Sequence, residues 1–344
     1  MFAKKNLVAA AALLAIAGAA QADVKVYGAL DVGMGSVEDA HAKGDKVRTT
    51  QVTSGGMMTS FLGFAGSEEL GGGLKAEFAL ETFMTPDTGA TAPNLAGGFW
   101  GRGSWVGLSG NFGRVALGQY DNPLFTSGYT YNPFGSSFLA SPTMRHFYSK
   151  TMSLGFDTGW VNAITYESPV VQGFNAIAQF APKETSTSGS NNSYAAAGAY
   201  NNGPISAMLT YEKAGYVAGS SAYLADQKVW NLGASYDFGA AKLFGQYTDL
   251  KTSKVSTGSV DVKNTIYQIG VSVPVTEKLV AMASFGSNKE NDKVADTKAT
   301  DRVFSLGLDY TLSKRTDVYL AFVNNTQTDM SSGQTVAAGI KHNF

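Results

Sequence analysis

Residues 74–81 have the sequence Leu-Lys-Ala-Glu-Phe-Ala-Leu-Glu, in which apolar residues alternate with positions that include Lys75, Glu77 and Glu81. Because successive side chains of a β-strand point to opposite faces, this stretch predicts a strand with one apolar and one charged face. A strand of a soluble sandwich can alternate in the same way. A charged second face, however, is expected where a strand separates lipid from a water-filled lumen.

The same alternation continues on both sides of this stretch. In residues 24–32 the valine and leucine side chains share one face, while Lys25, Tyr27 and Asp31 share the other. Residues 69–73, Glu-Leu-Gly-Gly-Gly, predict a tight hairpin turn, because glycine readily adopts the positive φ angles that such turns need. Further alternating segments occupy residues 61–67, 99–108, 114–119, 160–168, 173–181, 193–200, 204–213, 228–237, 240–250, 262–273, 278–287, 302–311, 316–324 and 334–344.

The connections between these segments alternate in length. Short connections are expected at residues 69–73, 109–113, 169–173, 201–204, 237–240, 274–278 and 312–316. Long polar connections are expected at residues 38–55, 120–150, 182–192, 214–227, 251–261, 288–301 and 325–333. Short turns on one side and long loops on the other are typical of bacterial outer-membrane barrels. We therefore predict an all-β fold, a transmembrane antiparallel β-barrel of about sixteen strands, wide enough for an aqueous lumen.

The long connection at residues 120–150 has the sequence YDNPLFTSGYTYNPFGSSFLASPTMRHFYSK. Its prolines at 123, 133 and 142 argue against a central strand, because proline cannot donate to a β ladder. No helical period is evident either. The stretch is rich in Phe and Tyr and poor in charge, whereas disordered segments are poor in aromatic residues. We therefore predict an ordered constriction loop that folds into the lumen of the barrel and buries its aromatic side chains.

The ends and the composition fit an exported barrel. Residues 1–22 resemble a secretory signal, with two lysines, an apolar run over residues 7–20 and the cleavage site Ala20-Gln21-Ala22. Removal of this segment would leave residues 23–344 as the barrel. Charged residues are only 15% of the chain, against about 25% in an average soluble domain, and cysteine is absent, which excludes thiol chemistry. The formal net charge of −1 is too small to indicate a nucleic-acid partner.

The last alternating segment ends on an aromatic residue. Val336, Ala338, Ile340 and His342 share one face with Phe344, the final residue. A carboxyl-terminal aromatic residue on an alternating strand is similar to the signal read by the outer-membrane assembly machinery. An ordinary edge strand is the alternative. We predict that Phe344 is an assembly signal.

Several stretches together resemble the general trimeric porins of β-proteobacteria and Neisseria. They are Val26–Asp31, Leu62–Phe64, Gly66–Gly71, Gly73–Phe78, Val106–Gly113, Leu312–Thr316 and Gly339–Phe344. The resemblance implies a sixteen-stranded homotrimer in the outer membrane of a Gram-negative bacterium, in contact with lipid and lipopolysaccharide. It also implies that the third long loop narrows each barrel, and that ions and small hydrophilic solutes diffuse through passively.

The departures from this family concern its lumenal arginines. Positions that are usually or often basic in the family hold Phe61, Ala65, Gln119 and Thr165, whereas Arg102 is retained. The candidate residues lining the constriction are Arg102, Asp121, Arg145, Phe61, Lys75, Glu77, Asp31 and Arg114. Because opposite charges that face one aqueous lumen partly cancel, we predict weak ion selectivity that leans to anions through Arg102, with help from Arg145.

Two other functions are open to the sequence. A substrate-specific channel would use the loop aromatics as a track for one solute, although the same residues could simply anchor the loop to the wall. An outer-membrane hydrolase would need a histidine base, and His146 lies near Ser149 and Asp157 in the sequence, but no nucleophile elbow is present. No enzymatic activity, cofactor or metal site is predicted.

Overall fold

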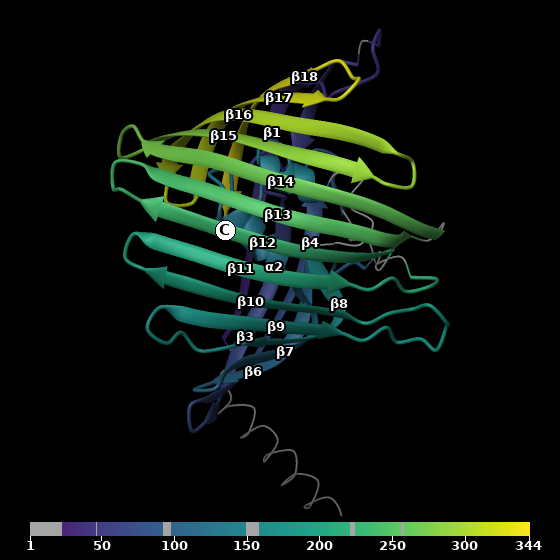
Figure 1. Cartoon of the computed structure of the whole chain (residues 1–344). Coiled ribbons are helices and arrows are strands. Elements are labelled where there is room, and N and C mark those ends of the chain that lie inside the picture. Colours follow the sequence, from purple (N-terminus) through teal and green to yellow (C-terminus); the bar gives the residue numbers. More distant parts are fainter. Residues whose placement is uncertain (1–22, 46, 92–97, 149–157, 221–223, 256–257) are drawn as a thin grey trace, which may run out of the picture.

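A computed structural model describes residues 23–45, 47–91, 98–148, 158–220, 224–255 and 258–344. The predicted signal segment at residues 1–22 lies outside these residues. The chain forms one antiparallel sheet that closes on itself, because the first strand, β1 (Asp23–Val37), pairs with the last, β18 (Gly333–Asn343), from Ala29↔Asn343 to Ser36↔Val336 (Figure 1). Closure leaves the ring of strands without an unpaired edge.

The closed sheet has sixteen strand positions. The strands between β1 and β18 are β3 (Phe61–Gly71), β4 (Leu74–Thr85), β6 (Gly103–Gly110), β7 (Gly113–Asp121), β8 (Gly159–Glu167), β9 (Phe174–Ala181), β10 (Ser193–Asn202), β11 (Ile205–Ala214), β12 (Ala225–Asp237), β13 (Lys242–Val255), β14 (Gly258–Pro274), β15 (Leu279–Asp292), β16 (Thr297–Ser313) and β17 (Thr316–Gln327). The short β2 (Thr49–Ser54) continues the line of β3, because both pair with β1. β5 (Ala90–Thr91) pairs only with the end of β4. The predicted fold class and strand number are confirmed.

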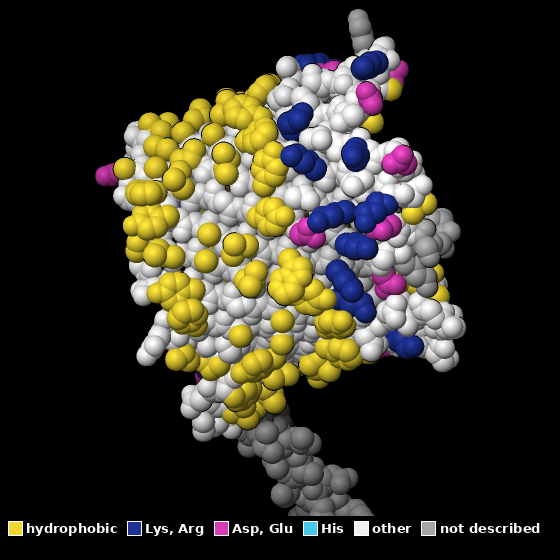
Figure 2. Space-filling model, viewed as in Figure 1, with side chains coloured by type: hydrophobic (Ala, Val, Ile, Leu, Met, Phe, Trp, Pro, Cys, Tyr) yellow, Lys and Arg dark blue, Asp and Glu magenta, His cyan; other side chains and the backbone are white. Residues whose placement is uncertain are grey.

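The two faces of the sheet differ in the way that the alternation predicts. Along β12, Val229 and Asn231 are buried on the concave face, whereas Trp230 and Leu232 are 53% and 50% exposed on the outer face. Large exposed hydrophobic side chains repeat in this manner around the barrel and form the yellow band of Figure 2. Such a band fits the hydrocarbon of a bilayer, where a closed ladder satisfies every backbone polar group. Neither described helix has the length and apolar character needed to cross a membrane.

Some strand boundaries differ from those expected. The connections predicted at residues 251–261 and 288–301 are largely strand, with pairs continuing to Val255↔Gly258 and Asp292↔Thr297. These ends are polar on both faces, so hydrophobic alternation gives no signal there, yet the cross-strand hydrogen bonds persist. The strand expected from residue 99 begins only at Gly103.

The segment predicted to be a constriction loop contains two short helices, so the prediction that it has no helix is wrong. They are α2 (Pro123–Thr130) and α3 (Pro142–Phe147). Each begins at a proline, which is tolerated in the first turn of a helix, where its missing N–H costs nothing. The side chain of Asn122 accepts a hydrogen bond from the Phe125 N–H at 2.8 Å, and that of Ser141 from the Met144 N–H at 3.2 Å. The dipeptides Asn122-Pro123 and Ser141-Pro142 therefore mark the starts of the two helices.

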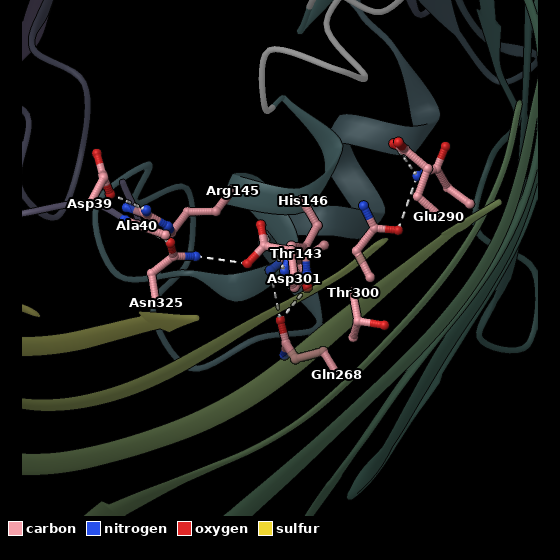
Figure 3. Close-up of polar contacts among 12 residues, drawn as sticks. Asp39, Ala40, Thr143, Arg145, His146, Gln268, Glu290, Thr300, Asp301 and Asn325 are labelled. Carbon is pink, nitrogen blue, oxygen red and sulfur yellow. Dashed lines mark hydrogen bonds and ion pairs between the residues drawn. The ribbon is translucent and has the colours of Figure 1, made fainter. Parts of the chain in front are cut away.

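The two helices lie on the concave side of the sheet (Figure 3). α2 contacts β10 to β12, and α3 contacts β14 to β16. Tyr131 and Phe134, between the helices, and Phe147 are almost completely buried. Glycines on the strands make room for these rings: a Cβ atom at Gly307 would lie 2.6 Å from the ring of Phe134. These aromatic side chains thus anchor the segment to the wall.

Candidate functional site

Three cavities follow one another along the concave face of the barrel. A turn-side cavity of about 500 Å³ is lined mainly by β3 to β8 and α2, and a loop-side cavity of about 550 Å³ by α3 and β15 to β17. A narrow cavity of about 40 Å³ shares Arg102 and Asp121 with the turn-side cavity and Phe138 with the loop-side cavity. The shared residues place the narrow cavity between the two larger ones.

Two residues, Glu81 and Phe61, hold Arg102 at the narrow cavity. Its backbone N–H donates to the carbonyl oxygen of Glu81 at 3.2 Å, and its guanidinium forms an ion pair with the Glu81 carboxylate. The guanidinium carbon lies 4.0 Å from the centroid of the Phe61 ring, a cation–π contact. Tyr27 packs edge-on against Phe61 and donates its hydroxyl to Glu81. The Phe61 ring therefore packs against the flat face of the Arg102 guanidinium.

Arg114 lies in the turn-side cavity between two glutamates. Its Nε is 3.0 Å from Glu77, and its Nη1 is 3.0 Å from Glu167. The hydroxyl of Tyr120 accepts from Arg114 at 3.2 Å and donates to Glu167 at 3.0 Å. The basic residues lining this cavity are Lys25, Arg102 and Arg114, and the acidic ones are Glu77, Glu81, Asp121 and Glu167. Positive and negative charge are nearly balanced there.

Arg145 lies in the loop-side cavity, so the structure does not bring it together with Arg102. It projects from α3 and forms an ion pair with Asp39 (Figure 3). The Asn325 amide donates to Asp301 at 2.7 Å. This cavity has Arg145 as its one basic residue among the described residues, against Asp39, Glu290 and Asp301.

His146 does not form a hydrolytic site with described residues. Its side chain is fully buried, its Nε2 lies 3.9 Å from Asp301, and neither ring nitrogen has a hydrogen-bond partner among the described residues. Ser149 and Asp157, which the sequence brings near it, lie outside those residues.

Asp31 and Lys75, two of the candidate lining residues, do not line the three cavities. Asp31 points inward but is fully buried, and it accepts from the N–H groups of Met57 and Met58 at 2.7 and 2.8 Å and from the Tyr319 hydroxyl at 2.6 Å. It fixes the bend between β2 and β3 and borders neither large cavity. The prediction missed this because alternation gives the face of a residue, not its depth.

Lys75 and Phe344 lie at the turn-side rim. Lys75 is exposed and paired with Glu69, away from the cavities. Phe344 exchanges two backbone hydrogen bonds with Gly28, at 3.2 and 3.1 Å, and its ring is 39% exposed on the outer face. Phe344 therefore lies on the outer face of the barrel, as its alternation with Ile340 and His342 predicted.

The candidate set omitted several residues of the site. Glu81 shares the parity of Glu77, and Glu167 shares that of the buried Thr165, so the alternation contained a signal for both. Glu212 is fully buried on β11 and accepts the N–H of Leu124 at 2.6 Å. Nothing in the sequence near Glu212 indicates that a helix begins beside it.

The comparisons agree with this geometry. A model of the Gram-negative porin family matches residues 9–330. The chain belongs to the Gram-negative porins. It is 37% identical over 335 residues to outer membrane porin protein 32 of Delftia acidovorans, covering 94% of this chain and 90% of that protein. It is 33% identical over 189 residues to the major outer membrane protein P.IB of Neisseria gonorrhoeae, covering 54% and 50% of the two chains.

Among solved structures, this porin is similar to the anion-selective porin from Comamonas acidovorans. The TM-score is 0.76 with 30% identity, covering 94% of this chain and all of the other. The resemblance to neisserial and β-proteobacterial porins is confirmed. This porin is an outer-membrane protein whose strands cross the membrane many times, and its family and fold are those of a channel.

Proposed function

We propose that this porin is a general diffusion channel with weak ion selectivity that leans to anions. The series of three cavities on the polar, concave face carries this proposal. A charged solute that keeps its water through these cavities avoids the large cost of entering hydrocarbon. The narrow cavity, where Arg102, Asp121 and Phe138 meet, would set the size limit.

The segment from Asn122 to Tyr148 would act as the constriction loop. Its helices lie against β10 to β12 and β14 to β16, so at the narrow cavity a solute would pass on the other side of the barrel, between this segment and the wall that carries Phe83 and Arg102. Removing part of this segment would widen the path. The aromatic residues that are buried against the wall are unavailable to a solute, which favours a general channel over an aromatic track.

The lean to anions rests on Arg102. It is the one basic residue lining the narrow cavity among the described residues, and walls of low dielectric focus its field. The similar porin from Comamonas acidovorans is named anion-selective. Asp121 at the same cavity and Glu81 beside the arginine oppose this preference, so we expect it to be weak.

We further propose that residues 1–22 are cleaved on export and that the remaining chain assembles as a homotrimer. The exposed ring of Phe344 on the outer face would be available to the assembly machinery. The family resemblance supports the trimer.

Single-channel recording in planar bilayers tests the general-channel function. We expect conductance to rise linearly with KCl concentration and to be blocked by no single sugar or amino acid at millimolar concentration. Conductance that saturates with one solute would instead support a substrate-specific channel.

A further inference from the structure

The aromatic side chains between Asn122 and Tyr148 fall into two sets. The rings that anchor the segment to the wall, Tyr131, Phe134 and Phe147, are almost completely buried. The other four line the cavities and pack against one another in the order Tyr129, Phe125, Tyr148 and Phe138. The centroids of successive rings in this order lie 5.2, 6.1 and 5.6 Å apart. We call these four residues the aromatic strip.

The aromatic strip runs through all three cavities. Tyr129 lines the turn-side cavity, Phe125 the narrow cavity and Tyr148 the loop-side cavity. Phe138 lines both the narrow and the loop-side cavity and is 37% exposed. Phe125 is only 9% exposed, so a small part of its ring is open to the narrow cavity. A solute that crosses the barrel therefore meets an aromatic ring in each cavity.

The narrow cavity combines these rings with a further ring and a guanidinium. Phe83 on β4 lines the same cavity, and so does Arg102. The ion pair of Arg102 with Glu81 uses one nitrogen, Nη1. The N–H groups on its Nε and Nη2 have no acceptor among the described residues. Because a guanidinium carries five N–H donors in a planar fork, Arg102 keeps donors for the carboxylate of a solute.

We propose that the narrow cavity selectively retains aromatic carboxylates, such as benzoate, as they pass. The carboxylate would accept hydrogen bonds from the remaining donors of Arg102, and the ring would pack against Phe125, Phe138 or Phe83. Aromatic pairs pack edge-on or offset at centroid separations of about 4.5–7 Å, and each pair favours association roughly two- to tenfold beyond the area that it buries. The inference rests on the proposed diffusion channel and names a class of solute that this channel favours.

Charge alone does not produce this preference. Asp121 lines the same cavity and opposes the entry of any anion. Its field acts alike on all monocarboxylates, because it depends on their charge and not on their ring. The expected preference is therefore for an aromatic acid over a saturated acid of equal charge. Benzoate and cyclohexanecarboxylate are such a pair, since each carries one carboxylate on a carbon ring of the same size.

Retention is measured as the reduction of KCl current through the purified porin in planar bilayers. Benzoate or cyclohexanecarboxylate is added at neutral pH, and the concentration that halves the current is determined for each. In the unmodified porin we expect this concentration to be roughly fivefold lower for benzoate. Phe138→Leu keeps an apolar side chain but removes the ring, so it should reduce the difference to about twofold or less. Phe238→Leu, in an exposed short turn, is the matched control and should leave the difference unchanged.

Phe83→Leu gives a second test from the other wall of the narrow cavity. It should reduce the preference for benzoate in the same way, because its ring lines the same cavity. A folding defect in Phe138→Leu therefore does not remove the test. The KCl current of each variant without added acid shows that it forms an open channel.

Equal half-current concentrations for the two acids in the unmodified porin would contradict the proposal. Full preference for benzoate in both ring variants, or an equal loss of preference in Phe238→Leu, would contradict it as well. Benzylammonium that halves the current at the same concentration as benzoate would show that the ring is recognised without the carboxylate, which is also incompatible with the proposal.

The same recordings separate this inference from the proposed function. A KCl current that saturates in the absence of any acid, or a channel that strongly prefers cations, would count against the weakly anion-selective diffusion channel. A linear KCl current together with equal retention of the two acids would leave the channel intact and count against the aromatic strip alone.

Discussion

The two sides of the barrel interior are built from different side chains. The loop-bearing wall, β11 to β16, meets the constriction loop with neutral amides: Gln246 donates to the carbonyl oxygens of Gly128 and Tyr131 at 3.1 and 3.0 Å, and Gln268 accepts the N–H of Thr143 at 3.2 Å. The charged wall, β1 to β8, carries the arginines and glutamates of the turn-side cavity.

The two walls differ in side-chain type because the loop covers one of them and leaves the other facing a cavity. Where the loop covers the wall, buried backbone groups need partners, and amides supply them without an uncompensated charge. On the charged wall the cavity stays open, so ion pairs such as Arg114 with Glu167 remain partly exposed. Glu212, buried on the loop-bearing wall, is an exception whose carboxylate meets the first turn of α2. The barrel thus separates the task of holding the loop from the task of contacting solutes.

The largest effect is expected from shortening the loop. Removal of residues between Tyr129 and Phe138 takes away the rings that fill the glycine positions of the loop-bearing wall. We expect single-channel conductance to rise by roughly twofold or more and larger sugars to enter, because the narrowest section of a pore limits its conduction. Conductance at the level of the unmodified porin would mean that the loop does not restrict the path.

A smaller effect is expected from adding a methyl group at Gly307, the glycine against which the Phe134 ring packs. In Gly307→Ala the new methyl group would lie 2.6 Å from the Phe134 ring, so the ring must move or the fold loses about 1–3 kcal/mol. Gly198→Ala is the matched control, because no atom lies within 4 Å of its Cβ position. Urea unfolding and conductance noise should change in the first variant and not in the second. Equal stability and equal noise in the two variants would argue against close packing of Phe134 on Gly307.

Glu212 offers a test of how the loop is anchored. Glu212→Ala leaves the Leu124 N–H buried without its acceptor, which costs about 1–3 kcal/mol. Glu212→Gln keeps an oxygen at the same place and should preserve most of the stability. We expect noisier channel currents in the alanine variant only. Quiet currents in both variants would show that α2 is held by its other contacts.

The sequence predicted the barrel well because alternation, turn glycines and loop lengths are local signals repeated many times. The sequence predicted that Glu77, Arg102 and Arg114 line the constriction; in the structure all three line the turn-side cavity, and of the three only Arg102 borders the narrow one. The sequence could not show that Asp31 is buried, since depth depends on the bend that residues 55–60 make against Tyr319. Likewise, Arg145 and Arg102 lie in separate cavities because of the path of the loop, which no local pattern encodes. The helices that begin at Pro123 and Pro142 did have a sequence signal, the capping residues Asn122 and Ser141, but the prediction did not interpret these residues as helix N-caps.

The charged wall is expected to give a small but decisive effect. Arg102 borders the narrow cavity, and its loss removes the ion-pair partner of Glu81 and leaves Asp121 as the one charged residue lining that cavity among the described residues. Phe61→Arg adds positive charge at the position where the Arg102 guanidinium now lies over a ring, so it should strengthen the preference for anions and narrow the pore.

The reversal potential under a KCl gradient, measured for the unmodified porin and for Arg102→Ala, tests most directly whether this wall governs the passage of ions. We predict weak anion preference in the unmodified channel and a shift toward cations of roughly several millivolts in the variant, at nearly unchanged conductance. A strongly cation-selective unmodified channel, or an Arg102→Ala channel with the same reversal potential, would contradict the assignment of the charged wall as the path of the ions.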